Sequence, residues 1–210
     1  MVGQVDGLFA VSAFLVDNLR RAGVEHANTH VIPSGANSRV FVPGTKEPGL
    51  VAAIGRMVPN KGPHLGLRAF AGAAGRHAHS RLVMVGDGPM RAECEALARS
   101  LGVAERVDFV GARDHRYVAD LLGRAEVFLQ HSVTSASGET EGLPSAIQAA
   151  MAAGAVVVAT RHAGIPEIVL DGQTGRLVDE HDIDGCAAAL SDVLGGAASS
   201  ARMAGAARRF

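Results

Sequence analysis

The chain has 210 residues, a formal net charge of −1 and 48% hydrophobic residues. Its length suits one good-sized α/β domain plus a remnant of another. The balanced charge, with no run of lysines or arginines, argues against nucleic acid as a partner and against a basic membrane-binding arm. Cys94 and Cys186 lie far apart and match no metal or redox motif, so we expect a cytoplasmic protein.

The first 45 residues predict a short α/β segment that leads into a hinge. Residues 1–11 carry no charged leader and no long apolar run, so we expect no signal peptide. We expect strands over residues 5–11 and 29–32, and between them a helix that is capped by Ser12 and ended by Gly23. Turn residues between positions 33 and 49 predict a boundary, after which residues 46–210 form the main domain.

The main domain alternates short apolar runs with helical segments, which is typical of a parallel α/β sheet. We expect strands over residues 50–54, 82–85, 107–111, 127–130, 155–159 and 175–178, and helices over residues 63–75, 90–101, 114–123, 143–153 and 182–194. Residues 142–160 carry no charge, but Pro144 and Gly154 divide them into helix and strand, which argues against a membrane span. The sequence therefore predicts a Rossmann-like, doubly wound parallel sheet.

A cationic loop, GRMVPNKG over residues 55–62, follows the first of these strands. We expect Gly55 to permit a sharp turn, and Arg56 and Lys61 to stand at the mouth of the next helix. The two charges fit a clamp for a diphosphate, assisted by the N–H groups of the helix, or an ordinary solvated loop. Because Gly62 follows Lys61, the loop is not a Walker P-loop.

Residues 139–167, ETEGLPSAIQAAMAAGAVVVATRHAGIPE, place an acidic loop before an alanine-rich helix, and a second glycine loop after a valine-rich strand. We expect Pro144 to lie in the first turn of the helix, whose free N–H groups favour an anion beside Glu141. The second loop starts at the carboxyl end of its strand, where open α/β sheets bind ligands. A phosphorylated sugar has both the anion and the hydroxyls that these groups would hold.

These motifs occur in the order found in a known family. Glu-Gly-Leu-Pro, Ala-Met-Ala-x-Gly and Gly-Ile-Pro-Glu, with Gly-Arg and Lys-Gly in the cationic loop, resemble the donor-binding C-terminal half of retaining GT-B glycosyltransferases of group 1. The resemblance covers roughly residues 5–209. It implies that residues 1–45 are a remnant of the N-terminal domain and hinge, and that residues 46–210 bind a nucleotide-diphosphate sugar without a metal or other cofactor.

The resemblance also implies roles for particular residues. Arg56 and Lys61 would hold the diphosphate and Glu141 the hydroxyls of the donor sugar, and these three form the expected catalytic set. Further contacts to the donor would come from Gly55, Leu143 and Gly164 around the anion, from Val107, Phe109 and Val110 as a nucleobase slot, and from His131 and His162 at strand ends. For the slot and the two histidines, an ordinary structural role is an equally open alternative.

Two patterns depart from this assignment. The family carries a second glutamate eight positions after the first, where this chain has Ala149, so we expect weaker contacts to the ribose. The adjacent Gln148 should face elsewhere, because one step along a helix turns a side chain by about 100°. Asp182-Ile183-Asp184 resembles the metal-binding carboxylates of other glycosyltransferases, but its position before a helix favours a cap.

The implied reaction is transfer of a sugar, with retention, to a sugar or lipid-linked acceptor in polysaccharide biosynthesis. It would require the missing N-terminal GT-B domain, and a peripheral contact of the full enzyme with a membrane is compatible with a lipid-linked acceptor. Two alternatives remain open. The chain would be a non-catalytic nucleotide-sugar-binding module or half of a split enzyme, or else an enzyme of the same fold such as a nucleotide-sugar epimerase.

Overall fold

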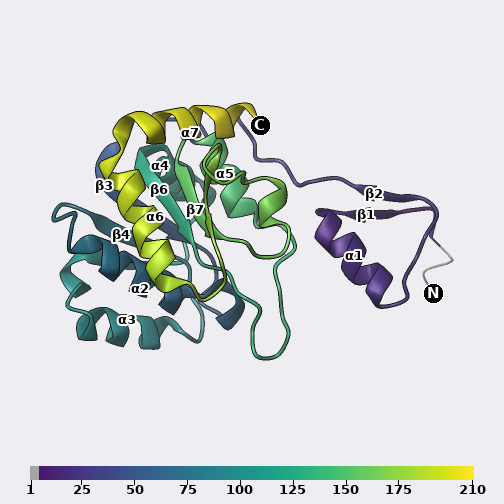
Figure 1. The fold of residues 1–210 in the computed structure, drawn as a ribbon, viewed down its shortest axis with the longest axis horizontal. Helices are drawn as coiled ribbons and strands as arrows, with labels where there is room; N and C mark the ends of the chain where they lie inside the picture. The colour runs from purple at the N-terminus through teal and green to yellow at the C-terminus, as the bar shows by residue number, and fades with distance from the viewer. Residues whose placement is uncertain (1–4) are drawn as a thin grey trace.

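Six parallel strands form the main sheet, in the order β5-β4-β3-β6-β7-β8 (Figure 1). The computed structural model describes residues 5–210. The strands are β3 (Glu47–Ile54), β4 (Arg81–Val85), β5 (Val107–Gly111), β6 (Ala125–Gln130), β7 (Val156–Thr160) and β8 (Gly175–Val178). The predicted doubly wound sheet is confirmed, and its switch point, where successive strands begin to add on the other side, lies between β3 and β6.

Helices cover both faces of this sheet (Figure 1). One face packs against α2 (Pro63–Ala74), α3 (Arg91–Ser100) and α6 (Ile183–Gly195), and the other against α4 (His115–Arg124) and α5 (Ser145–Ala152). The last helix is α7 (Ala197–Arg209). Its Met203 packs in the hydrophobic core on the α2, α3 and α6 face, and its Ala207 packs in the core on the α4 and α5 face. Short 3₁₀ helices occupy Pro59–Lys61, Ala104–Arg106 and Ile165–Glu167 and are labelled η2, η3 and η4.

Local sequence signals explain where several helices begin. The Asp182 carboxylate accepts a hydrogen bond from the N–H of Gly185 at 2.8 Å, so the predicted cap of α6 is confirmed. Pro144 has a ψ of 117° and precedes α5, so the first helical residue is Ser145 and the proline is outside the first turn. Every residue of β7 is buried, as expected for a strand covered on both faces.

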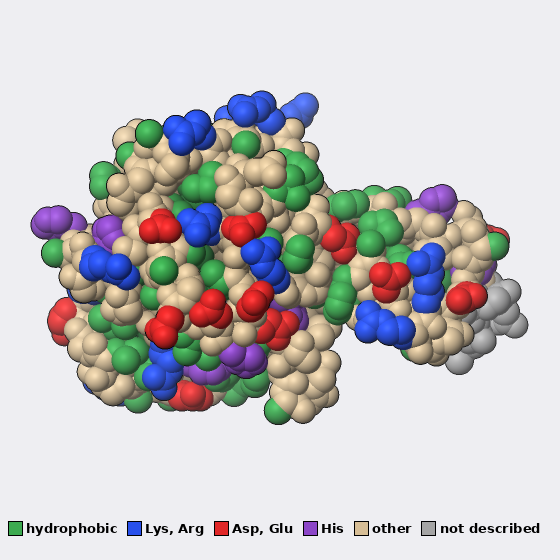
Figure 2. Space-filling view, in the orientation of Figure 1, with side chains coloured by type: hydrophobic (Ala, Val, Ile, Leu, Met, Phe, Trp, Pro, Cys, Tyr) green, Lys and Arg blue, Asp and Glu red, His purple; other side chains and the backbone are tan. Residues whose placement is uncertain are grey.

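The N-terminal segment forms a second, two-stranded parallel sheet from β1 (Leu8–Ala10) and β2 (Thr29–Val31), joined by α1 (Ala13–Arg21). Figure 1 shows this segment beside the main sheet, connected to it by extended chain, and in the space-filling view of Figure 2 it projects from the rest of the molecule. Ser12 caps α1 by accepting from the N–H of Leu15 at 3.3 Å, as predicted. The origin of residues 1–45 as a domain remnant stays a prediction. The expectation that residues 1–11 form no signal peptide concerns in part residues 1–4, which lie outside the described residues.

The start of α1 docks on the main domain. The carboxylate of Glu167 accepts hydrogen bonds from the backbone N–H groups of Ala13, at 2.8 Å, and Phe14, at 2.9 Å. A Cβ atom added at Gly142 would lie 2.8 Å from the Leu15 side chain, and one at Gly164 would lie 2.6 Å from that of Ser12. Gly164 therefore permits the close approach of α1, whereas a Cβ at Gly142 would displace only the flexible end of the Leu15 side chain.

The helices in the described part of the chain are too short or too polar to cross a membrane. The uncharged residues 142–160 divide between α5 and β7, as the sequence predicts.

Candidate functional site

A small cavity of about 40 Å³ lies at the switch point of the sheet, where β3, β4 and β6 end. Its walls include Gly55, Arg56 and Lys61 from the cationic loop, with Val85 and Gln130 from the neighbouring strands. The structure thus brings together three of the predicted site residues at the edge where ligands bind in this class of sheet. Arg56 is exposed to solvent and Lys61 is partly buried.

The turn after Lys61 depends on glycine. Gly62 has a φ of +54°, and a Cβ atom there would overlap the carbonyl oxygen of His131. Gly55 has no positive φ, so the turn at the end of β3 does not need the conformational freedom that we expected it to use. Instead, the aliphatic part of Lys61 passes over Gly55, 3.7 Å from the position of an added Cβ. This path carries the ammonium group toward α5.

Lys61 and Glu141 form an ion pair, with 2.8 Å between Nζ and Oε1 and side chains that are 19% and 11% exposed. Glu141 Oε1 is buried and has no hydrogen-bond partner among the described residues, so its contact with Lys61 is an ion pair. In chemical terms, an ammonium group can bind phosphate oxygens and a carboxylate can accept hydrogen bonds from hydroxyl groups. The sequence predicted both residues but not their pairing.

The backbone of Glu141 is held by a buried histidine. Its N–H donates to His162 Nε2 at 3.0 Å, and His162 Nδ1 donates to Glu180 Oε1 at 2.6 Å. Burial raises the pKa of Glu180, but hydrogen bonds from His162 and Thr134 outweigh this effect and lower it overall. Glu180 lies between β8 and α6 and matches no family motif, so it was not predicted as a site residue.

The other predicted donor contacts are spread over three places. Leu143 is buried in the core beside α5, and the N–H of Gly164 donates to the carbonyl of Gly142 at 3.0 Å, so this N–H joins two loops and is not free for an anion. Val107 lies in the core at the start of β5, remote from the carboxyl edge. Phe109 and Val110 are half-buried nearer the end of β5 and pack toward opposite faces of the sheet.

His131 follows the end of β6 and has 1% of its surface exposed, and within residues 5–210 neither of its ring nitrogens has a hydrogen-bond partner. Burial lowers its pKa to about 4, so the ring is neutral near pH 7. The preceding Gln130 donates from Nε2 to Ser132 Oγ at 2.9 Å, and its Oε1 has no partner. Only Gln130 of these two is among the residues that line the cavity at the switch point.

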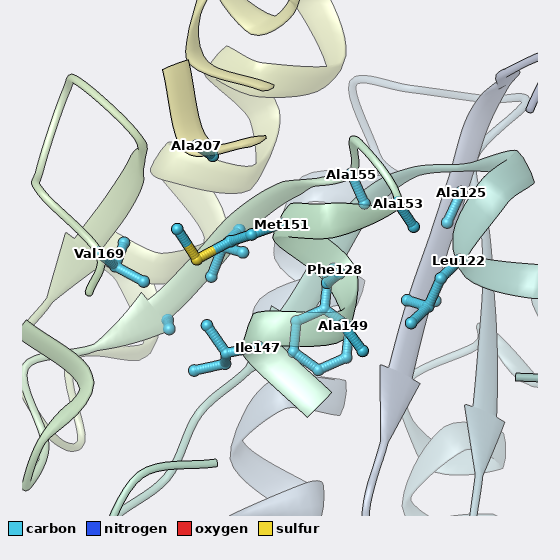
Figure 3. Packing of buried hydrophobic residues seen from close by; sticks show 14 of the residues in the cluster. Leu122, Ala125, Phe128, Ile147, Ala149, Met151, Ala153, Ala155, Val169 and Ala207 are labelled. Atoms are coloured by element: carbon cyan, nitrogen blue, oxygen red, sulfur yellow. The ribbon is translucent and has the colours of Figure 1, made fainter. Parts of the chain in front are cut away.

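A larger cavity of about 530 Å³ adjoins the first one, since Ile54 lines both. It lies between residues 35–41 of the hinge, α4 and α5, and its walls include Arg113, His115 and Ala149. Ala149 is 6% exposed and belongs to the same buried cluster as Ile147 and Phe128 (Figure 3). Arg113 and His115 are exposed residues just after β5, and no sequence pattern predicted either one at a cavity.

Gln148 Nε2 donates to Ser34 Oγ at 3.2 Å, so this side chain points toward the hinge and not into the cavity beside Ala149. Its predicted orientation is confirmed. Within residues 5–210, no three His, Cys, Asp or Glu side chains are grouped so that they could hold a metal ion.

Comparison with known proteins identifies the family. Residues 37–210 match the family described as glycosyl transferases group 1. The chain is 32% identical over 202 residues to a GDP-mannose-dependent alpha-(1-6)-phosphatidylinositol monomannoside mannosyltransferase of Mycolicibacterium smegmatis, covering 90% of this chain and 52% of that protein. It is 33% identical over 150 residues to the putative colanic acid biosynthesis glycosyltransferase WcaL of Salmonella typhimurium, covering 70% of this chain and 37% of that protein.

The fold also matches solved structures. The crystal structure of Anabaena HepE in complex with UDP-glucose superposes with a TM-score of 0.83 at 23% identity, over 96% of this chain and 57% of that one. The chain spans about half the length of HepE and of the Mycolicibacterium relative. Its six-stranded sheet corresponds to a Rossmann-like domain of the GT-B fold. The chain belongs to the group 1 glycosyltransferase family, as a C-terminal-like half of a GT-B enzyme.

Proposed function

We propose that residues 46–210 bind a nucleotide-diphosphate sugar, and that the whole enzyme transfers this sugar with retention of configuration. The observation that carries the proposal is the Lys61–Glu141 ion pair beside the cavity at the switch point. It supplies a cation for phosphate and a carboxylate for hydroxyls within one contact distance. A diphosphate-linked sugar presents phosphate oxygens to the cation and hydroxyl groups to the carboxylate.

The proposed roles follow from position and charge. Arg56, at the exposed rim, would grip phosphate oxygens with its planar guanidinium, and Lys61 would place a point charge on the same group. Together they would neutralise the negative charge that develops on the leaving diphosphate. Glu141 would accept hydrogen bonds from the hydroxyls of the sugar. The adjoining cavity of about 530 Å³ is of the size that small-molecule sites have, and would receive the nucleoside.

Binding of the acceptor is proposed for the whole protein and not for residues 46–210 alone. We propose a sugar or lipid-linked acceptor bound mainly by an N-terminal GT-B domain, consistent with the lipid named for the Mycolicibacterium relative. The relatives name different nucleotides, GDP in that enzyme and UDP in the HepE complex. Both uridine and guanosine nucleotides are therefore used in the binding experiment.

Isothermal titration calorimetry with UDP, GDP, their sugar conjugates and the free nucleosides tests the assignment. Arg56→Ala and Lys61→Ala should each weaken binding of the nucleotide diphosphate by about 1.5–3 kcal/mol, the range for hydrogen bonds to charged groups. Binding of the nucleoside should change little, and Arg99→Ala, at an exposed site on α3, is the control. Equal losses of affinity for the nucleoside and for the nucleotide diphosphate would refute the assignment of Arg56 and Lys61 to the diphosphate.

Ala149 favours a second candidate, a nucleotide-sugar-binding module without turnover. The residue lines the proposed nucleoside cavity but offers no acceptor for ribose hydroxyls. Donor hydrolysis and sugar transfer by the 210-residue chain separate the two functions. Tight donor binding without either reaction, even after addition of an N-terminal GT-B domain, would favour the module.

A further inference from the structure

The loop that carries Glu141 has no regular structure of its own. Residues 131–144, between β6 and α5, contain no helix or strand, and Figure 1 shows this teal-green loop extending past the end of the sheet. Loops of this length in compact domains are uncommon and usually serve function. The position of Glu141 against Lys61 must therefore come from contacts between the loop and the rest of the domain.

His162 supplies one of these contacts from the end of β7. Its imidazole is 1% exposed, and each ring nitrogen has a partner. Nε2 accepts from the N–H of Glu141 at 3.0 Å, which requires a lone pair there and places the proton of the neutral ring on Nδ1. Nδ1 then donates to Glu180 Oε1 at 2.6 Å. The two bonds together select one tautomer and one orientation of the ring.

Glu180 extends the same network to the other end of the loop. Its Oε2 accepts from the N–H of Thr134 at 2.7 Å. Between Thr134 and Glu141, two hydrogen bonds within the loop join Ser135 to Glu139. The N–H of Ser135 donates to the carbonyl of Glu139 at 3.0 Å, and the N–H of Glu139 donates to Ser135 Oγ at 3.0 Å. One imidazole–carboxylate pair thus joins both ends of the loop, Thr134 and Glu141, to the carboxyl ends of β7 and β8.

We propose that His162 and Glu180 are positioning residues, which act as a hydrogen-bonded clamp that holds Glu141 in place to contact the sugar of the donor. The role given to Glu141 rests on the proposed function, whereas the clamp itself rests on the contacts above. Neither His162 nor Glu180 lines the cavity at the switch point, so the clamp acts through the Glu141 backbone. Catalytic side chains need this kind of support, because small displacements from the productive geometry reduce binding and rate.

Two variants of His162 test the clamp against a merely structural role. His162→Leu removes both hydrogen bonds, whereas His162→Gln keeps an acceptor that reaches the position of Nε2. In His162→Leu we expect about tenfold faster exchange of the Glu141 amide and about tenfold weaker binding of the sugar nucleotide. The affinity for the nucleotide diphosphate without sugar should change less than about twofold. His162→Gln should restore most of the amide protection at Glu141 and most of the affinity for the sugar nucleotide. His79→Leu, exposed on the opposite edge of the domain, is the control.

Two further measurements keep the test independent of folding and of donor binding. If His162→Leu does not fold, Glu180→Leu at a more exposed position should accelerate exchange of both the Thr134 and Glu141 amides. The ¹⁵N spectrum of the wild-type imidazole should show the Nδ1–H tautomer. Absence of sugar-nucleotide binding by the wild-type chain would count against the proposed function, while amide exchange would still decide the clamp. Unchanged exchange at Glu141, or equal losses for both ligands, would overturn it.

Discussion

Glu141→Gln removes the charge that holds Lys61 in the free protein and leaves a side chain of the same shape. The two charged atoms are 2.8 Å apart, and at an effective dielectric constant of about 20 their gross attraction is about 6 kcal/mol. Much of this is offset by desolvation, because the two side chains are only 19% and 11% exposed. We take a net value on the order of 1–2 kcal/mol, which is a factor of roughly 5–30 in an equilibrium constant.

A diphosphate that binds Lys61 must compete with this carboxylate and is repelled by it. We therefore expect Glu141→Gln to bind the nucleotide diphosphate more tightly, by roughly 5- to 30-fold. The sugar nucleotide should gain less or lose affinity, because a neutral amide replaces the charged acceptor for the sugar hydroxyls. The quantity that matters is the ratio of the two dissociation constants.

Isothermal titration calorimetry with both ligands, on the wild type and Glu141→Gln, measures this ratio. Glu139→Gln is the matched control, because Glu139 is exposed in the same loop and forms no ion pair in the described structure. An unchanged or weaker affinity for the diphosphate in Glu141→Gln would show that Lys61 does not bind phosphate at the expense of Glu141.

Three further predictions concern other parts of the domain. Ala149→Glu should tighten ribonucleotide binding by about 1–2 kcal/mol in calorimetry and leave a dideoxyribose analogue unaffected; equal effects on both would refute ribose contact. Burial lowers the pKa of His131 from 6.5 to about 4, so the free energy of unfolding should fall by about 3 kcal/mol as the pH falls from 6.5 to 4. Urea titrations of His131→Asn should lack this loss of stability, and the same dependence of stability on pH in wild type and variant would contradict the prediction. Burial raises the pKa of Cys94 to about 11 and of Cys186 to about 12, so neither thiol should react with a disulfide dye before unfolding; rapid labelling of the native protein would contradict this.

The sheet was predictable because its signals are local and repeated. Each short apolar run followed by a helical segment predicts one βα unit, and a series of such units permits few arrangements other than a doubly wound sheet. The location of Gly55, Arg56 and Lys61 was predictable for the same reason, because they follow a strand whose carboxyl end lies at the same edge of the sheet as those of the other parallel strands. Boundaries were less certain, as Pro144 shows by lying just outside α5.

The rest of the site depends on loop conformations that no local pattern determines. The pairing of Lys61 with Glu141 requires two loops, about eighty residues apart in sequence, to converge in space. Glu180 follows β8 without any motif, so its bond to His162 had no signal in the sequence. Val107 was included in the nucleobase slot because its whole strand was treated as one unit, although its position at the start of β5 places it at the opposite edge.

The docking of α1 connects this helix directly to the two loops that contain Gly142 and Glu167. The Glu167 carboxylate takes both of its bonds from the first turn of α1, and Ser12 Oγ donates to the carbonyl of Gly142 at 3.4 Å, one residue after Glu141. A Cβ atom at Gly164 would lie 2.6 Å from both the Gly142 carbonyl oxygen and the Ser12 Cβ, so α1 and the two loops are closely packed at this point. A displacement of α1 relative to the main sheet would therefore move the Gly142 carbonyl, one residue after Glu141, and so change the position of Glu141 relative to Lys61.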